Sequence, residues 1–191
     1  MAIVILNAPP ASGKDTIANT LVKLHGFRKL EFKQRIYDIA KSILGDSFSQ
    51  FQKDLANREA KEVPQDYLGS ISPRQFMIKV SEDWIKPLFG DEYFGVAAAE
   101  AASKSIKHHV VFPDGGFPDE ILPLRELGVP VVAIRLYREG YDFGSDSRRY
   151  LPEYAGHCTL DLQLVEGKPE AAVNEILGLL DFLNYNRIFQ K

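Results

Sequence analysis

The residues best suited to chemistry lie at the start of the chain, where an apolar run leads into a turn of small residues. The run 3–6 is followed by Asn7-Ala8-Pro9-Pro10-Ala11-Ser12-Gly13-Lys14-Asp15-Thr16, and apolar residues with helical spacing begin at Ile17. Small residues let successive backbone N–H groups turn inward as an anion-binding nest, and the N-terminus of a following helix adds partial positive charge. Lys14 can then reach the β- and γ-phosphates as a mobile charge. A strand, such a loop and a helix predict a phosphate-binding loop.

This loop departs from the usual G-x-x-x-x-G-K-[ST] pattern at two positions. Ala8 stands where the first glycine belongs, and Asp15 stands where a Mg²⁺-binding hydroxyl is usual. Thr16, one residue later, resembles the Gly-Lys-x-Thr ending of nucleoside monophosphate kinases. The alternative is an ordinary strand-to-helix turn with an exposed lysine. The buried strand before the turn and the amphipathic helix after it favour phosphate binding.

A second candidate site begins where the apolar run 109–113 ends at Asp114, which two glycines follow. In open parallel sheets, ligands bind beyond the carboxyl ends of the strands. Asp114 would therefore share an edge with the phosphate loop if the two strands are neighbours. There it could hold Mg²⁺ through water or orient an attacking hydroxyl. The alternative is an aspartate in a glycine-rich turn.

Cations at two expected helix starts suggest anion binding. Lys33 and Arg35 lie at the start of a helix that is predicted to end at Gly45. The helix dipole disfavours cations at a helix N-terminus. The two residues therefore either mark an anionic ligand or are two solvated charges. Ser72-Pro73-Arg74-Gln75 has the pattern of a capping box that opens a helix ending at Gly90. Arg74 lies off its predicted buried stripe and could bind a phosphate bidentately, or it is a surface arginine. That stripe comprises Phe76, Val80, Trp84 and Leu88.

The segment 137–157 is expected to be a loop that carries Arg138, Asp146, Arg148 and Arg149 among glycines and aromatic residues. A flexible, arginine-bearing segment after a late strand suits a lid that closes on transferring phosphates. The alternative is a disordered surface loop.

Composition limits the class of protein. The length of 191 residues suits one α/β domain, and the net charge of -3 gives no overall basic field that would attract nucleic acid. The one cysteine, Cys158, allows no internal disulfide, which fits a reducing cytosol, and with His157 it offers too few ligands for a metal site. We expect no signal peptide and no membrane span.

Strands are predicted near 2–7, 28–32, 109–113, 130–136 and 160–165, with helices between them. This alternation predicts an α/β fold with a parallel sheet and helices on both faces.

Four motifs together resemble the bacteriophage deoxynucleoside monophosphate kinases: Gly13-Lys14-Asp15-Thr16, Phe32-Lys33, Ser72-Pro73-Arg74 and Asp114 with Phe117-Pro118-Asp119-Glu120. The resemblance implies a P-loop NTPase three-layer sandwich, with a five-stranded parallel sheet, helices on both faces and a lid segment at about 137–157. It implies one kinase domain over 1–191, ATP-dependent transfer of phosphate to a deoxynucleoside monophosphate, and a location in the cytoplasm, that of the host if the protein is phage-encoded.

The resemblance also implies roles for individual residues, with ATP and Mg²⁺ as cofactors. The ATP-binding residues would be Ala11, Ser12, Gly13, Lys14, Asp15 and Thr16. The acceptor-binding residues would be Phe32, Lys33, Arg35 and Arg74. The catalytic residues would be Lys14, Asp114, Arg148 and Arg149. The metal-binding residues would be Asp15, Thr16 and Asp114, in part through water.

One departure from the family keeps the acceptor open. The family usually has an arginine before the Phe-Pro pair, whereas Gly115 and Gly116 precede Phe117-Pro118 here. A related phage branch phosphorylates the hydroxymethyl group of 5-hydroxymethyluracil in DNA. Such a hydroxyl needs a general base, for which Asp114 or Asp15 is the candidate, whereas a nucleotide phosphate is already ionised. A third alternative, a nucleotide-binding protein without transfer activity, is disfavoured by the arginines of the lid and by Arg74.

Overall fold

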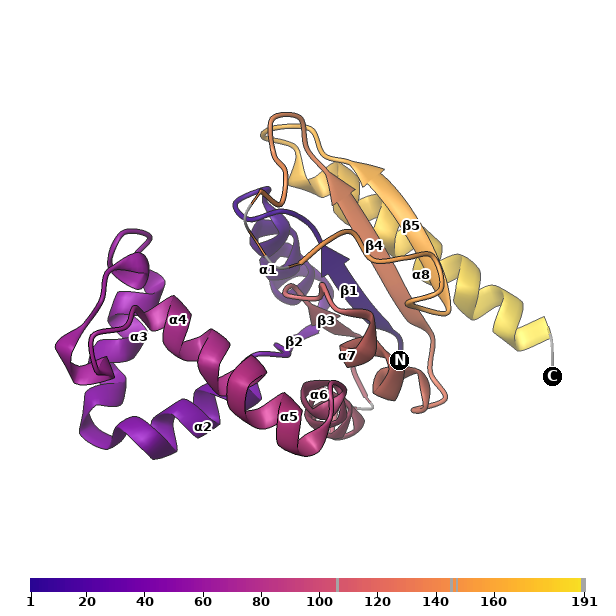
Figure 1. Cartoon of the computed structure of the whole chain (residues 1–191). Coiled ribbons are helices and arrows are strands. Elements are labelled where there is room, and N and C mark those ends of the chain that lie inside the picture. Colours follow the sequence, from indigo (N-terminus) through magenta and orange to yellow (C-terminus); the bar gives the residue numbers. More distant parts are fainter. Residues whose placement is uncertain (106, 145, 147, 190–191) are drawn as a thin grey trace. The chain divides into compact units, whose positions relative to one another are not determined.

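The computed structural model of the protein describes residues 1–105, 107–144, 146 and 148–189, with side chains up to residue 184. The chain divides into two compact units (Figure 1). The first comprises Met1–Phe32 and Gly95–Lys191, and the second comprises Lys33–Phe94.

The first unit is built on a five-stranded sheet in the order β2-β3-β1-β4-β5, and every neighbouring pair is parallel. The strands are β1 (Ile3–Asn7), β2 (Arg28–Lys29), β3 (Val110–Phe112), β4 (Val131–Tyr137) and β5 (Cys158–Gln163). Ile3 of β1 lies opposite Val110 of β3 and Val131 of β4. The sequence placed all five strands correctly to within a few residues.

Helices cover both faces of this sheet. They are α1 (Lys14–His25), α6 (Tyr93–Ser103), α7 (Pro118–Arg125) and α8 (Pro169–Phe189). Alternate residues of β1 point to opposite faces: Val4 and Leu6 join the core formed with α1 and α8, whereas Ile3 and Ile5 join the core formed with α6 and α7. The predicted three-layer sandwich with a five-stranded parallel sheet is confirmed.

The second unit is helical. Its elements are α2 (Gln34–Leu44), η1 (Gly45–Ser47), α3 (Phe48–Ala56), η2 (Ala60–Glu62), η3 (Asp66–Leu68), α4 (Pro73–Ile78), η4 (Lys79–Ile85) and α5 (Lys86–Phe89). Ala40, Phe51 and Leu68 form its buried centre. The predicted capping box is present at α4, where Ser72 Oγ accepts the Gln75 N–H (3.2 Å) and Gln75 Oε1 accepts the Ser72 N–H (3.0 Å).

The predicted buried stripe of this last helical run is wrong beyond Val80. Trp84 is 47% and Leu88 65% exposed, while Ile85 is buried. The cause is η4, a π-helical stretch whose i→i+5 hydrogen bonds take one more residue into each turn. The buried positions Val80 and Ile85 are therefore five residues apart instead of four.

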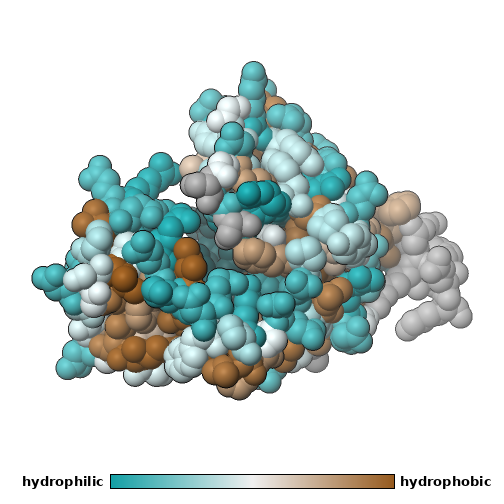
Figure 2. All heavy atoms as spheres, in the orientation of Figure 1, coloured by the Kyte–Doolittle hydropathy of each residue, from teal (hydrophilic) through white to brown (hydrophobic). Residues whose placement is uncertain are grey.

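The face of the molecule drawn in Figure 2 is mainly hydrophilic, with hydrophobic residues scattered among polar ones. Among the described residues, no helix has the length and apolar character that crossing a bilayer requires.

Candidate active site

The loop between β1 and α1 contains two residues in the left-handed backbone region, a conformation that anion nests use. Ala11 and Gly13 have φ angles of 61° and 108°, which turn the chain sharply before the first residue of α1. Among the described residues, a Cβ on Gly13 would meet only Arg138 Nη1, at the ordinary contact distance of 3.8 Å. Glycine is therefore needed at this position for its backbone angle and not for space.

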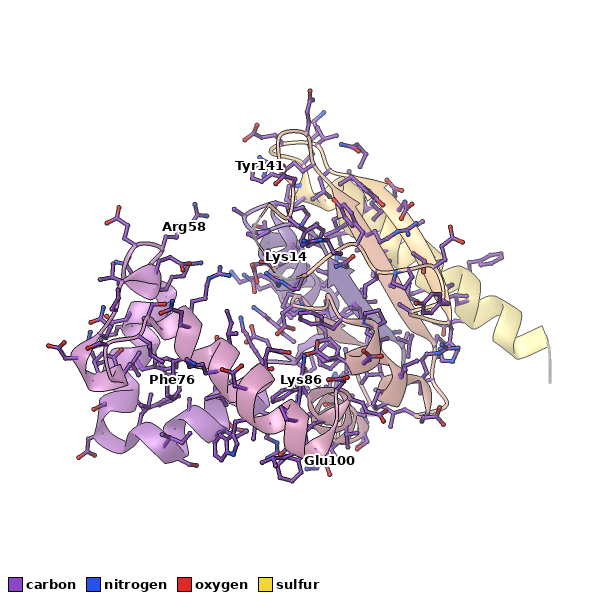
Figure 3. All side chains as sticks on the ribbon, in the orientation of Figure 1. Lys14, Arg58, Phe76, Lys86, Glu100 and Tyr141 are labelled. Carbon is purple, nitrogen blue, oxygen red and sulfur yellow. The ribbon has the colours of Figure 1, made fainter. Side chains whose placement is uncertain are left out.

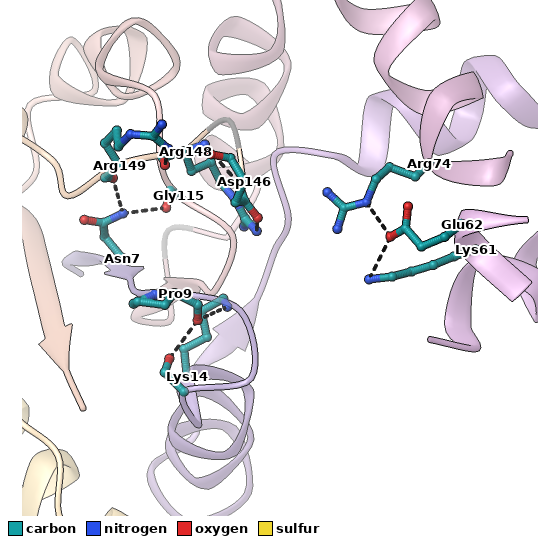
Figure 4. Close-up of polar contacts among 11 residues, drawn as sticks. Asn7, Pro9, Lys14, Lys61, Glu62, Arg74, Gly115, Asp146, Arg148 and Arg149 are labelled. Carbon is teal, nitrogen blue, oxygen red and sulfur yellow. Dashed lines mark hydrogen bonds and ion pairs between the residues drawn. The ribbon is translucent and has the colours of Figure 1, made fainter. Parts of the chain in front are cut away.

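The Lys14 side chain is folded into this loop. Its ammonium donates to the carbonyl of Pro9 at 3.0 Å, and the Ser12 hydroxyl donates to the same oxygen at 2.9 Å (Figure 4). Lys14 is only 7% exposed. A mobile ammonium held in this way can exchange a backbone carbonyl for phosphate oxygens.

Asp15 and Thr16 lie exposed on the first turn of α1. Asp15 Oδ1 is 3.8 Å from Lys29 Nζ, so its carboxylate pairs with a surface lysine. Thr16 lines the cavity beside the loop. The described part of the chain holds no cluster of three or more His, Cys, Asp or Glu residues that could bind a metal ion without help from a ligand.

A cavity of about 320 Å³ opens beside the phosphate loop. Its lining combines small and apolar residues with two charged ones, and comprises Ser12, Gly13, Thr16, Ile17, Arg138, Leu164, Val165, Glu166, Gly167 and Pro169. Space of this kind, with apolar walls and few polar groups, suits a planar organic ligand.

Arg138 links this cavity to the loop. Its Nη1 donates to the Ser12 carbonyl at 3.3 Å and its Nη2 pairs with Glu166 at 2.9 Å. The guanidinium also lies over the ring of Tyr141, 4.6 Å from the centroid; Figure 3 shows Tyr141 on the segment after β4. The sequence placed Arg138 only in the lid. Its position directly after a strand, at the edge where ligands bind, was the available signal.

Asp114 lies just beyond β3, and β3 is hydrogen-bonded to β1. The condition for Asp114 to share an edge with the phosphate loop is therefore met. Its Oδ1 accepts the backbone N–H of Phe32 at 3.1 Å. The ring of Phe32 is 3% exposed and stacks on Phe112 with centroids 4.6 Å apart. Thus the ring of Phe32, predicted to face the acceptor, lies in the core, and its amide orients Asp114.

The predicted lid is described except for residues 145 and 147, and it is partly packed: Phe143, Asp146 and Leu151 are buried. Arg148 binds both carboxylate oxygens of Asp146, at 2.9 and 2.7 Å. Arg149 donates from Nη1 to the carbonyls of Asp146 and Arg148. The described residues of this segment are therefore held by burial and hydrogen bonds within the first unit.

The surroundings of Arg148 are acidic. The hydrogen bond to Asp146 raises the pKa of the Arg148 guanidinium against the opposing effect of burial, and the negative charges of Asp146, Asp114 and Glu120 raise it further. The predicted catalytic residues Asp114 and Arg148 thus lie close enough for their charges to interact.

The remaining predicted acceptor-binding residues belong to the second unit. Lys33 Nζ lies 5.8 Å from the centroid of the Tyr37 ring, and Arg35 is half-buried on the first turn of α2. Arg74 Nε donates to Glu62 at 2.8 Å, and the Lys61 ammonium lies 3.8 Å from the same oxygen (Figure 4). Contact of these residues with an acceptor stays a prediction.

No family model matches the sequence of this chain, and the search of curated proteins found no match. Similar solved structures include a gluconokinase from Sinorhizobium meliloti 1021, with 15% identity and a TM-score of 0.52 over 100% of this chain and 97% of that one. A sugar kinase from Janibacter sp. HTCC2649 has 15% identity and a TM-score of 0.50 over 95% of both chains.

A kinase of Chloroflexus aurantiacus J-10-fl, itself described as putative, has 13% identity and a TM-score of 0.51 over 94% of this chain and 96% of that one. At such low identity the likeness shows the fold alone. The chain thus shares the three-layer α/β fold of these solved structures, as expected from its sequence, while the deoxynucleoside monophosphate branch stays a prediction.

Proposed function

We propose that this chain is an ATP-dependent kinase that transfers the γ-phosphoryl group to a deoxynucleoside monophosphate. The observation that carries the proposal is the burial of the Lys14 ammonium inside a loop with two left-handed residues, at the N-terminus of α1. The conformation of the loop and this ammonium are suited to triphosphate oxygens.

The adjacent cavity would take the adenine base. It begins at Ser12 and Gly13 of the loop and has about 320 Å³ of space between apolar walls. Arg138 stands between the loop and the cavity, where its planar guanidinium could stack on the base. Residues 11–16 would then bind the phosphates of the same nucleotide.

The oxygen donors near the loop suit Mg²⁺, which prefers carboxylate and hydroxyl oxygens and keeps several waters. Thr16, Asp15 and Asp114 are the residues that would hold it, together with the phosphates. When bound, Mg²⁺ neutralises charge on the phosphate oxygens. Because the protein donors are few, we expect Mg²⁺ to bind together with ATP.

The chain's own residues would act by positioning and charge. Lys14 would bind the β- and γ-phosphate oxygens, and Arg148 and Arg149 would stabilise negative charge on the transferring group. An acceptor phosphate is already ionised and would attack in line without a base. We propose that the segment 137–157 acts as the lid and that the chain works as one kinase domain.

The second unit would bind the acceptor. Arg74 lies in the first turn of α4, next to the backbone N–H groups of a helix N-terminus. Glu62 fixes the guanidinium through Nε, which presents the two Nη groups as a bidentate pair. Lys33 and Arg35 would add charge at the start of α2.

A hydroxyl acceptor is a second candidate, because Asp114 is held by the Phe32 amide and could serve as a general base. The hydroxymethyl group of 5-hydroxymethyluracil in DNA is such an acceptor. Gluconate is included in the test because one similar structure is a gluconokinase.

The test is to supply γ-labelled ATP with each deoxynucleoside monophosphate, with DNA containing 5-hydroxymethyluracil, and with gluconate. We expect label in a nucleoside diphosphate, and none with Lys14→Ala. Label in DNA alone would favour the second candidate. ATP binding without any transfer would contradict both, and would favour a nucleotide-binding protein.

Arg74→Ala tests the acceptor assignment. It should raise the KM for the monophosphate by about tenfold or more, as expected for a lost charge-assisted pair, and leave the KM for ATP unchanged. Arg58→Ala removes the same charge from an exposed position of the second unit and serves as the control. Equal effects of the two variants would argue against a direct contact of Arg74.

A further inference from the structure

The side chain of Asn7 is fully buried at the end of β1, immediately before the phosphate loop. Its amide nitrogen donates to the carbonyls of Gly115 (3.1 Å) and Arg149 (3.0 Å). Its carbonyl oxygen accepts the backbone N–H of Leu151 at 2.7 Å. Figure 4 shows Asn7 between the turn after β3 and the segment that carries Arg149.

These three bonds use the hydrogen-bonding groups of an asparagine. The side-chain amide has two N–H donors, which meet two carbonyls, and one oxygen, which meets an N–H. An aspartate would set a carboxylate oxygen against two carbonyl oxygens. An apolar residue would leave two carbonyls and one N–H without this partner, each at the cost of a lost hydrogen bond.

The partners of Asn7 adjoin the groups to which chemistry is assigned. Gly115 follows Asp114 directly, and Arg149 follows Arg148 directly. The phosphate loop begins one residue after Asn7. One side chain thus ties the end of β1 to two segments that each lie more than 100 residues further along the chain.

We infer that Asn7 is a positioning residue for phosphoryl transfer: it fixes the Asp114 turn and the Arg148–Leu151 segment relative to the phosphate loop. Asn7 touches no substrate, since it is completely buried, and acts through the backbone of its partners. The inference rests on the proposed function. It extends that function by naming what sets the distance from Asp114 and Arg148 to the phosphates.

The first test uses Asn7→Asp and Asn7→Ala, with Val4→Ala as the matched control. Val4 is also on β1 and fully buried, but it packs in the apolar core with α1 and α8. The Asn7 variants should lose roughly 10- to 100-fold in kcat, the effect expected of a small misplacement, with little change in the KM for ATP. Val4→Ala, at a similar loss in Tm, should keep its kcat. Equal losses of kcat in all three variants would overturn the inference.

The second test asks whether Asn7 acts through Arg148. If it does, Asn7→Asp should reduce kcat much less in an Arg148→Ala background than in the wild-type chain. If the fold losses in kcat of the two single variants instead multiply in the double variant, Asn7 does not act through Arg148. That result would overturn that part of the inference.

The third test needs no activity. Asn7→Ala should speed hydrogen exchange at the Leu151 amide by about tenfold or more, because that N–H loses its partner, whereas Val4→Ala should not. Unchanged protection of Leu151 would overturn the inference. The wild-type protein could also transfer no phosphate while Asn7→Ala still loses protection at Leu151. That outcome would support the hydrogen bonding of Asn7 and overturn only the proposed function.

Discussion

The side chain of Arg148 lies directly against the backbone of Gly116: a Cβ added to Gly116 would fall 2.5 Å from Arg148 Cγ. Gly115 is equally confined, since its Cβ would fall 2.2 Å from Ile5 Cγ2. Both glycines are therefore required by close packing. Gly116 precedes the Phe117-Pro118 pair, and the side chain of Arg148 covers the turn that the two glycines form.

Gly116→Ala should therefore displace Arg148. The added methyl group cannot be accommodated without moving the stem of that side chain, which lies among Asp146, Asp114 and Glu120. If Arg148 stabilises the transferring phosphate, kcat should fall by roughly 10- to 1000-fold, as for loss of one such donor. Direct titration with an ATP analogue should show unchanged affinity, because the phosphate loop is untouched.

Gly178→Ala is the matched control for this substitution. Gly178 lies in α8, and among the described residues a Cβ there would have no heavy atom within 4 Å outside the helix's own backbone and chain neighbours. Alanine should raise the free energy of unfolding by about 0.5–1 kcal/mol through helix propensity and leave kcat unchanged. If Gly116→Ala kept full activity as Gly178→Ala does, Arg148 would have no part in the transfer.

Arg138→Ala tests the base cavity. Removing the guanidinium takes away its bond to the Ser12 carbonyl and its pairing with Glu166. We expect the Kd for ATP, measured by calorimetry, to rise by about tenfold, and Arg138→Lys to restore little of the loss, because lysine lacks the planar stacking surface. Arg28→Ala removes an equal charge from an exposed position on β2. A Kd that moves equally in both variants would point to overall charge instead of a contact.

Much of the fold was predictable because apolar strands and helical spacing are local patterns. β1 and β4 are buried almost throughout and are followed by turn residues, which predicts parallel strands at the centre of a sheet. The sharp turn between β1 and α1 was predictable for the same reason, since its small residues and Gly13 lie next to one another in the sequence. The sheet order also places β3 beside β1, so that Asp114 lies at the same sheet edge as the loop after β1.

The features that were missed depend on contacts between distant segments. Asn7 reads in the sequence as a polar residue at a strand end, but its partners lie beyond residue 114. Phe32 was assigned to the acceptor by the family resemblance, and the stacking of its ring on Phe112 leaves no local pattern in the sequence. The π-helical stretch η4 was missed because one additional residue in a helical turn does not give the apolar residues a recognisable spacing in the sequence.

That stretch can be tested by comparing Ile85→Ala with Trp84→Ala. Ile85 is 4% exposed and Trp84 is 47% exposed. Truncating the buried isoleucine should lower the free energy of unfolding by about 2–5 kcal/mol, and truncating the larger tryptophan should cost less. Urea titrations of the two variants measure this. A greater loss of unfolding free energy with Trp84→Ala would instead support the regular α-helix with a buried Trp84 that the sequence predicted.

His109 predicts how stability depends on pH. Its Nδ1 accepts the backbone N–H of Ala2 at 3.1 Å, and its ring stacks on Phe27 with centroids 5.2 Å apart. Burial, and then the charge of the N-terminus, lower the pKa of His109 below its ordinary value of 6.5. The unfolded chain therefore takes up this proton at a higher pH than the folded chain, and the stability contributed by neutral His109 should be lost as the pH falls below about 6.5.

His109→Asn isolates this contribution, because an asparagine side-chain oxygen can accept the same N–H but does not titrate. Between pH 7.5 and about 5.5, the free energy of unfolding should fall more steeply in the wild-type chain than in this variant. His108→Asn alters the adjacent, exposed histidine and should follow the wild-type curve. Parallel curves for the wild type and His109→Asn would mean that the Ala2 contact persists when the ring is protonated, contrary to the assignment of Nδ1 as an acceptor.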